Sequence, residues 1–295
     1  MTLQELVRRT EQQLLAAGVS FGHGTANARD EAAWLVLHAL GLPLDTDLDQ
    51  ASNQPLNQAQ QAQAATLLEA RIATRQPLAY LTREAWLQGV PFYVDKRAIV
   101  PRSLIAECLA DGSIDPWLSD RTRHVLDLCT GNGSLAVLAA MAWPDVMFDA
   151  ADVSADALAV ARINVDRHGL AKRIRLIESD GLAACPGPYD LILCNPPYVN
   201  AASMAALPAE FRAEPALALA GGDDGMDFVR HLLAGAPARM SDDAVLVLEI
   251  GHERAHFEAA FPALEPLWLD TSAGGDQVLL LTREALVAAA PGATA

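Results

Sequence analysis

The chain has 295 residues, a net charge of −16 and a mean hydropathy of +0.16, which fit a globular protein with a catalytic domain and a smaller one. Residues 101–295 hold 13 basic and 27 acidic side chains, a net charge of −14. This negative charge repels the phosphate backbone of nucleic acids and favours a basic partner, although it leaves room for a local basic groove. No apolar run approaches the roughly 20 residues that span a membrane, so we expect no membrane partner.

The first 85 residues have helical periodicity. One helix is expected from Leu3, ending at Gly18, and a second over 28–41, with acids in its first turn and Gly41 as its stop. Gln and Ala are good helix formers and predict a third helix within 50–75. Residues 1–85 are therefore interpreted as a helical domain, which either recognises a substrate or serves only as a structural bundle.

Residues 86–104 are expected to form a β-hairpin linker. The stretch "LQGV" indicates its turn, and Phe92, Val94, Ile99 and Val100 indicate strands. Residues 105–295 form the third and largest part of the predicted division into domains.

Strands and helices alternate from about residue 120, which predicts a doubly wound α/β fold with a parallel sheet. The final strands, "LWLDT" and "QVLLLT", are joined by a link too short to cross over a parallel sheet. They must therefore be antiparallel neighbours, and we expect one reversed strand at an edge of the sheet.

Three strand ends carry residues suited to adenosine. Gly131 and Gly133 in "DLCTGNG" allow a tight turn and close backbone approach, but the loop lacks the lysine of a nucleoside triphosphate site. Asp152 follows Gly131 by 21 residues, the spacing of an acid that binds ribose hydroxyls, and Asp180 is placed to contact adenine. A structural acid near a helix N-terminus is the alternative for Asp152. NAD and S-adenosylmethionine both fit such a pocket.

The fourth strand runs into "NPPY", where the prolines must end it near Cys194. Asn195 Oδ1 and the Pro196 carbonyl could accept both hydrogens of a planar NH₂ group, a carboxamide or a nucleobase amine, while Tyr198 stacks on its plane. Such a nitrogen is a poor nucleophile, so positioning and electrostatics would supply most of the catalysis. The alternative is a structural Asn-Pro turn.

A resemblance adds to this interpretation. The ordered stretches "DLCTGNG", "ADVSADAL", "SDG", "NPPYV", "EPALALAGGDDG" and "GGDQVLLLT" are similar to the glutamine-N5 protein methyltransferases. That family implies a class I fold of seven strands with S-adenosyl-L-methionine as cofactor and S-adenosyl-L-homocysteine as product. "NPPY" alone is shared with enzymes that methylate nucleobase amines, whereas the ordered set is more specific.

One branch of this family modifies the Gly-Gly-Gln loop of peptide release factors, and the other modifies large-subunit ribosomal protein L-three. The stretches "FGHGTANARDEAAWLVLHALGLPLD", "AYLT", "FYVDKRAIVPRSLIAE" and "LPAEFRAEPALAL" resemble the second branch. The release-factor branch has Pro-Arg followed by Pro and an acid where this chain has "PRSLIAE". Overall the resemblance runs from about Phe21 to Thr282.

The resemblance also implies site residues. The carboxamide of the substrate glutamine would be held by Asn195, Pro196, Pro197 and Tyr198. The cofactor would be bound by Asp127, Cys129, Thr130, Gly131, Asn132, Gly133, Asp152, Asp180, Gly181 and Asn195. Gly181 departs from relatives that carry a bulkier residue beside adenine, so the packing against adenine is expected to differ from theirs.

Two histidine motifs raise the question of metal or substrate contacts. "HERAH" matches the zinc protease pattern HExxH, but Gly251 ends a strand just before it, so His252 would lie at a helix entrance rather than within the helix. His23 lies between two glycines, typical of a turn, with contact to a ribosomal-protein substrate as the alternative. The four cysteines lack zinc spacing and favour a reducing cytoplasm, so no metal is expected.

The predicted function is methyl transfer from S-adenosylmethionine to a glutamine side-chain amide of L-three, with no direct nucleic-acid partner. Release-factor methylation and nucleobase amino-methylation are the alternative activities. The non-enzymatic alternative is an assembly factor that binds a ribosomal protein through the helical domain.

Overall fold

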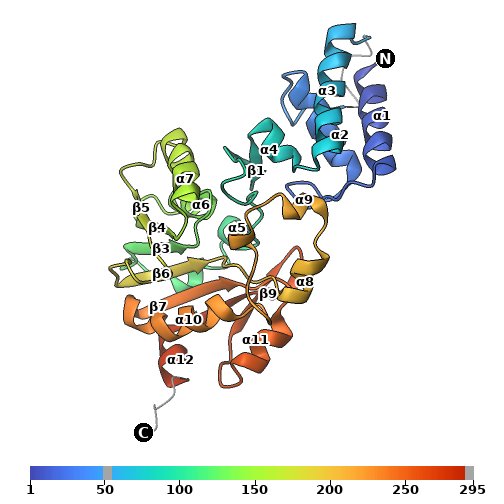
Figure 1. The fold of residues 1–295 in the computed structure, drawn as a ribbon. Helices are drawn as coiled ribbons and strands as arrows, with labels where there is room; N and C mark the ends of the chain where they lie inside the picture. The colour runs from blue at the N-terminus through green and yellow to red at the C-terminus, as the bar shows by residue number, and fades with distance from the viewer. Residues whose placement is uncertain (49–54, 290–295) are drawn as a thin grey trace.

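The computed structural model describes residues 1–48 and 55–289. Its N-terminal part lies at one end of the molecule (Figure 1) and contains the helices α1 (Leu3–Ala16), α2 (Ala28–Ala39), α3 (Gln58–Thr74) and α4 (Leu78–Thr82). Capping boxes at Thr2 and Asn57 satisfy the first amides of α1 and α3. The apolar faces of these helices form a separate core around Leu14, Leu35 and Leu68.

The helix stops follow the expectations from sequence. Gly18 and Gly41 both adopt positive φ, at 59° and 65°, just beyond α1 and α2. The third helix is shorter than the window 50–75, because α3 begins at Gln58, and the part of that window at 50–54 lies outside the described residues.

A short hairpin, β1 (Ala85–Leu87) and β2 (Val90–Phe92), follows α4. Gln88 and Gly89 have φ of 49° and 73°, as a two-residue hairpin turn with both positions left-handed requires, so the turn at "LQGV" is confirmed. Strand structure at Val94, Ile99 and Val100 was a wrong expectation, because residues 93–100 form no strand. Val94 and Val100 are instead buried in the N-terminal core, which explains their apolar character.

The C-terminal part is built on a seven-stranded sheet in the order β5-β4-β3-β6-β7-β9-β8, in which only β9 is antiparallel to its neighbours. The strands are β3 (His124–Leu128), β4 (Met147–Asp152), β5 (Ile174–Glu178), β6 (Tyr189–Cys194), β7 (Met240–Glu249), β8 (Leu267–Thr271) and β9 (Gly274–Thr282). The doubly wound, mostly parallel sheet is confirmed. The reversed strand, however, lies between β7 and β8 rather than at the edge, because β9 also pairs with β7.

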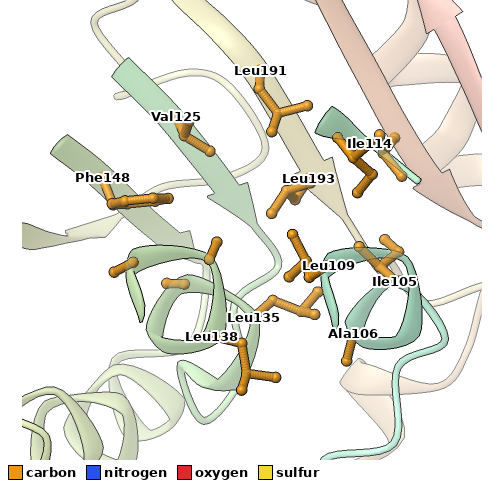
Figure 2. Close-up of a cluster of buried hydrophobic side chains, with 14 of the residues drawn as sticks. Ile105, Ala106, Leu109, Ile114, Val125, Leu135, Leu138, Phe148, Leu191 and Leu193 are labelled. Atoms are coloured by element: carbon orange, nitrogen blue, oxygen red, sulfur yellow. The ribbon is translucent and has the colours of Figure 1, made fainter. Parts of the chain in front are cut away.

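Helices cover both faces of the sheet. One face packs against α5 (Ile105–Ala110), α6 (Ser134–Ala142) and α7 (Ala155–Arg167), and the other against α10 (Asp227–Gly235), α11 (Arg254–Ala260) and α12 (Arg283–Ala288). Figure 2 shows the first face, where Val125, Leu191 and Leu193 of the sheet meet side chains of α5 and α6. Alternation along β3 sends Val125 to this face and Leu126 to the opposite one.

The remaining elements lie in connections. They are the 3₁₀ turns η1 (Asp115–Trp117), η2 (Ala216–Ala218) and η3 (Ala236–Arg239) and the short helices α8 (Ala201–Ala206) and α9 (Ala209–Arg212). We call residues 207–220, which contain α9 and η2, the strap. The division into 1–85, 86–104 and 105–295 stays a proposal for the domain boundaries.

Candidate active site

A cavity of about 260 Å³ opens where β3, β4 and β6 end, at the edge of the sheet where open α/β folds bind ligands. Seven of the predicted site residues line it: Cys129, Gly131, Asp152, Asp180, Gly181, Asn195 and Pro197. The other six do not line it: Asp127, Thr130, Asn132, Gly133, Pro196 and Tyr198. The structure thus brings together residues from the ends of four strands, β3, β4, β5 and β6, that are far apart in sequence.

Asp127, on β3, is fully buried beneath the loop that follows the strand. Its Oδ2 accepts hydrogen bonds from the Thr130 hydroxyl at 2.5 Å and the Ala136 amide of α6 at 3.0 Å, while Oδ1 has no partner among the described residues. Burial raises the pKa of Asp127 from 3.8 to about 7 against these two hydrogen bonds. Asp127 therefore fixes the loop to α6 rather than facing the cavity.

The loop between β3 and α6 is left-handed at three positions. Cys129, Gly131 and Gly133 have φ of 60°, 55° and 81°. A Cβ on Gly133 would lie 3.1 Å from the Ala161 Cβ of α7, whereas a Cβ on Gly131 would meet no atom within 4 Å. Gly133 thus allows α6 and α7 to pack closely. Gly131 leaves the loop backbone accessible to a ligand in the cavity.

Asp152 ends β4 as expected and lies on the cavity wall. Its Oδ2 accepts from the Gly131 amide and its Oδ1 from the Ser154 amide, both at 2.9 Å. Burial raises the pKa of this carboxyl, although the two amides favour its ionised form. The structural and ligand-binding interpretations of Asp152 therefore coexist, because each carboxylate oxygen has a second lone pair for a further donor.

The side of the cavity formed by Asp180 and Gly181 is only partly enclosed. β5 ends at Glu178, two residues earlier than the sequence suggested, and the exposed Asp180 carboxylate has no hydrogen-bond partner among the described residues. A Cβ built on Gly181 would lie 4.0 Å from the Phe228 ring. Phe228, on α10, therefore forms the wall next to this glycine.

The strand β6 ends at Cys194, as the prolines dictate, so Asn195 and Pro197 reach the cavity. Within the described ranges the Asn195 side chain has no hydrogen-bond partner. The following segment is fixed by a bridge in which the Val199 amide donates to the Leu219 carbonyl at 2.8 Å and the Gly221 amide donates to the Val199 carbonyl at 2.9 Å. Asn195 is thus a free amide on an anchored loop.

Tyr198 was expected to stack over a bound NH₂ group, but it is not one of the residues that line the cavity. Its hydroxyl donates to Glu249 Oε1 at 3.2 Å, and a Cβ on Gly251 would come within 2.5 Å of its ring. Burial and the neighbouring carboxylate raise the pKa of the Tyr198 hydroxyl. Tyr198 is therefore held by the hydrogen bond to Glu249 and by the close contact with Gly251.

Sequence reasoning missed two segments of the wall. The linker contributes Arg97, Ala98 and Ile99, and the strap contributes Pro215, Leu217 and Ala218. Leu217 is 61% exposed although it lines the cavity. The stretch "EPALAL" was noted only for its resemblance, and its neighbouring prolines and apolar residues gave no period that would have placed it beside Asn195.

A partly buried ion pair anchors the strap. The Glu214 carboxylate accepts hydrogen bonds from both terminal nitrogens of Arg102, at 2.7 and 2.8 Å, and from the Val100 amide at 2.9 Å. Burial would raise the pKa of Glu214, but Arg102 and His23 hold it at about 2. The strap and the linker are therefore joined beside the cavity.

His23 does not face a partner protein, as one interpretation allowed. It is 2% exposed, its Nε2 lies 3.4 Å from Glu214 Oε2, and its ring centroid is 4.2 Å from that of Phe211. The glycines around it do form a turn, with φ of 121° at Gly22 and 96° at Gly24.

The HExxH motif has the geometry expected of a helix entrance. α11 begins at Arg254, so His252 precedes the helix. The Glu253 carboxylate is hydrogen-bonded to the Asn200 side-chain amide at 2.6 Å and to His256 Nδ1 at 2.5 Å. Among residues 1–48 and 55–289, no three His, Cys, Asp or Glu side chains are grouped as metal ligands.

Comparisons agree with this architecture. The model of the Methyltransferase small domain family matches residues 106–222, and that of the PrmC N-terminal domain family matches residues 5–82. The solved hMettl16 catalytic domain, in complex with MAT2A 3'UTR hairpin 6, has a TM-score of 0.51 at 14% identity over 76% of this chain and 80% of that one, which supports the fold alone. Fold and site together define a class I methyltransferase.

Closer relatives specify the family. The ribosomal protein uL3 glutamine methyltransferase of Bordetella pertussis is 55% identical over 97% of this chain and 96% of its own length. The proteins of the same name from Burkholderia pseudomallei and Neisseria meningitidis serogroup A are 51% and 47% identical, over 98% and 97% of this chain and 97% and 94% of their own lengths. The chain belongs to the family of ribosomal protein uL3 glutamine methyltransferases. In the described part of the chain, no helix is long and apolar enough to cross a membrane.

Proposed function

We propose that this protein transfers a methyl group from S-adenosyl-L-methionine to the side-chain nitrogen of a glutamine in ribosomal protein uL3, the L-three protein of the large subunit. The observation that carries the proposal is the unpartnered amide of Asn195, fixed beside Pro197 in the same cavity that holds Asp152 and Asp180. The names of the near full-length relatives supply the substrate. A cytoplasmic location is part of the proposal, since ribosomal proteins are made there.

The cavity residues suit the cofactor in three ways. The space over Gly131 is open, so backbone can approach a ligand closely. Asp152 is held by two backbone amides and retains acceptor capacity for ribose hydroxyls. Asp180 is exposed at the cavity and suited to the adenine amine, with Phe228 as an apolar wall beside Gly181.

S-adenosyl-L-methionine supplies an electrophilic methyl carbon on its sulfonium. The residues of the chain position the nitrogen that attacks it. Asn195 Oδ1 and the Pro196 carbonyl accept the two N–H bonds of the glutamine carboxamide, which aims the nitrogen and favours positive charge on it during transfer. The methylated nitrogen is more acidic than the original amide and releases its extra proton after transfer. No step requires a strong base among these residues.

The substrate proposal agrees with charge. A net charge of −16 attracts a basic ribosomal protein and opposes naked nucleic acid. The Arg102–Glu214 pair also places the linker stretch "PRSLIAE" next to the strap that lines the cavity. The stretch "PRSLIAE", in which this chain differs from the release-factor branch, thus lies beside the proposed glutamine site.

The first test offers labelled S-adenosyl-L-methionine and purified enzyme to uL3, peptide release factor and naked ribosomal RNA in separate reactions. We expect label on one glutamine of uL3, located by mass spectrometry of peptides. Label on release factor alone would overturn the substrate, and label on RNA alone would mean that Asn195 holds a nucleobase.

The same assay includes Asn195→Ala, for which we expect kcat to fall about 100-fold or more because one of two acceptors is lost. Asn57→Ala, which removes only the cap of α3, is the matched control and should keep full activity. Undiminished activity of Asn195→Ala would contradict the carboxamide clamp.

A further inference from the structure

Glu249 lies beside the proposed reaction centre, although sequence analysis did not single it out. The parallel register pairs Cys194 of β6 with Leu248 of β7, so Asn195 and Glu249 are neighbours at the carboxyl edge of the sheet. Glu249 is 3% exposed and does not line the cavity. A buried acid at this place requires hydrogen-bond partners to offset its desolvation.

Three donors satisfy the carboxylate. Oε2 accepts from the Ser103 hydroxyl at 2.5 Å and the Leu104 amide at 2.8 Å, and Oε1 accepts from the Tyr198 hydroxyl at 3.2 Å. Burial raises the pKa of Glu249, whereas these donors favour its ionised form. Glu249 thus connects the linker to the loop that carries Asn195.

The surroundings of Tyr198 leave it little freedom to move. A Cβ on Gly251 would come within 2.5 Å of its ring, and a Cβ on Gly225 would come within 2.3 Å of its carbonyl oxygen. Glycines therefore allow Tyr198 to sit tightly against two other segments, and its hydroxyl is directed to one carboxylate oxygen. A ring so enclosed is suited to fixing the peptide that precedes it.

We propose that Glu249 is a positioning residue for the transfer reaction, acting through the Tyr198 hydroxyl to hold the Asn195–Tyr198 loop in its productive geometry. This inference rests on the proposed function and deepens it. Ser103 and Leu104 fix the carboxylate, the carboxylate fixes Tyr198, and Tyr198 fixes the acceptors that meet the carboxamide. Small misplacements of reacting groups cost large factors in rate, so a remote anchor can control kcat.

The test compares Glu249→Ala, Glu249→Gln, Tyr198→Phe and the double variant Glu249→Ala/Tyr198→Phe. We expect Glu249→Ala and Tyr198→Phe each to lower kcat about 10- to 100-fold, with the affinity for S-adenosyl-L-homocysteine changed less than about twofold. Glu249→Gln should recover part of the loss, because its amide can still meet the tyrosine oxygen. The double variant should be no slower than the slower single one.

Asp190 is the matched control. It accepts hydrogen bonds from the Arg123 and His124 amides and the Ser241 hydroxyl, but at the opposite end of β6. Asp190→Ala should lower the melting temperature without changing kcat. A folded Glu249→Ala or Tyr198→Phe enzyme with wild-type kcat, or additive losses in the double variant, would overturn the inference.

Hydrogen exchange separates this inference from the proposed function. In the ligand-free protein, the amides of residues 198–201 should exchange faster in Glu249→Ala than in wild type, and their exchange should be unchanged in Asp190→Ala. Unchanged exchange in Glu249→Ala would refute the positioning role whatever the substrate. Failure of the wild-type enzyme to methylate any glutamine would refute the proposed function instead.

Discussion

At the scale of single residues, Asp127 shows how a buried charge can shape a ligand site without touching the ligand. Its Oδ2 holds the Thr130 hydroxyl and the Ala136 amide, and its Oδ1 is buried without a partner among the described residues. Burial removes the hydration of the carboxylate charge, and protonation relieves that cost. The carboxyl is therefore neutral over a wider pH range than an exposed aspartate.

This neutrality predicts a pH dependence. The folded protein keeps the proton of Asp127 up to a pKa of about 7, whereas the unfolded chain releases it near 3.8, so this group makes the fold less stable as pH rises between those values. Asp127→Asn lacks this dependence. Its free energy of unfolding, measured with urea relative to wild type, should rise by about 2–3 kcal/mol from pH 5 to pH 8. A difference that is constant with pH would contradict the raised pKa.

Some site residues could be predicted from sequence because strand ends are local signals. Asp152 and Asn195 each follow an apolar run, and both line the cavity. The role of Asp127 depends on the position of α6, and that of Glu249 depends on which strand pairs with β6. Those contacts are long-range, although a lone acid at the end of "AVLVLE" is a signal that could have drawn attention to Glu249.

At the scale of elements, the β3–α6 loop assigns different tasks to its two glycines. Both Gly131 and Gly133 have positive φ, but only Gly133 faces another helix closely. Gly131 faces open space and its amide binds Asp152. Helix packing and ligand approach are therefore separable in this loop.

Alanine substitutions should separate them experimentally. Each adds about 1–2 kcal/mol of backbone strain at a left-handed position. Gly133→Ala should lose about 1–2 kcal/mol more than Gly131→Ala, because its methyl group would press on Ala161 at 3.1 Å. Gly131→Ala should chiefly weaken binding of S-adenosyl-L-homocysteine, as measured by calorimetry. Equal losses of stability in urea would show that Ala161 gives way freely.

The elements that sequence could not place are those whose apolar residues serve distant surfaces. Val94 and Val100 look like strand residues but pack into the N-terminal core, because the linker runs beside the helices. The position of β9 was also missed, since a short link fixes its pairing with β8 but says nothing about β7. Alternating strands and helices, by contrast, were predictable because their periods are local.

At the scale of the whole molecule, buried ion pairs connect the helical part to the strap beside the cavity. Arg71 of α3 is 0% exposed and donates to Glu31 at 2.8 Å and to the Ser20 carbonyl at 2.9 Å. It also lies 3.4 Å from Glu210 in the strap. One arginine therefore links two helices of the N-terminal part to the segment that borders the cavity.

Arg71→Ala should lower the free energy of unfolding by about 3–5 kcal/mol, because it leaves the buried Glu31 without its arginine. Glu210 keeps its ion pair with Arg75 at 2.9 Å. Arg121→Ala is the control, since its ion pair with Asp243 is exposed at 83% and 80% and such pairs contribute about 0–1 kcal/mol. Urea denaturation of both variants provides the comparison. Similar losses in the two would mean that the Arg71 network adds no more than a surface pair.

The order of strands in the sheet has a consequence for the newly made chain. β8 pairs with β9 and is separated by it from β7, yet β9 is synthesised after β8. Until residues 274–282 have left the ribosome, β7 presents an open apolar edge and β8 has no place in the sheet. Closure of the sheet therefore waits for β9, and a ribosome that stalls before β9 would release a chain prone to edge-to-edge aggregation.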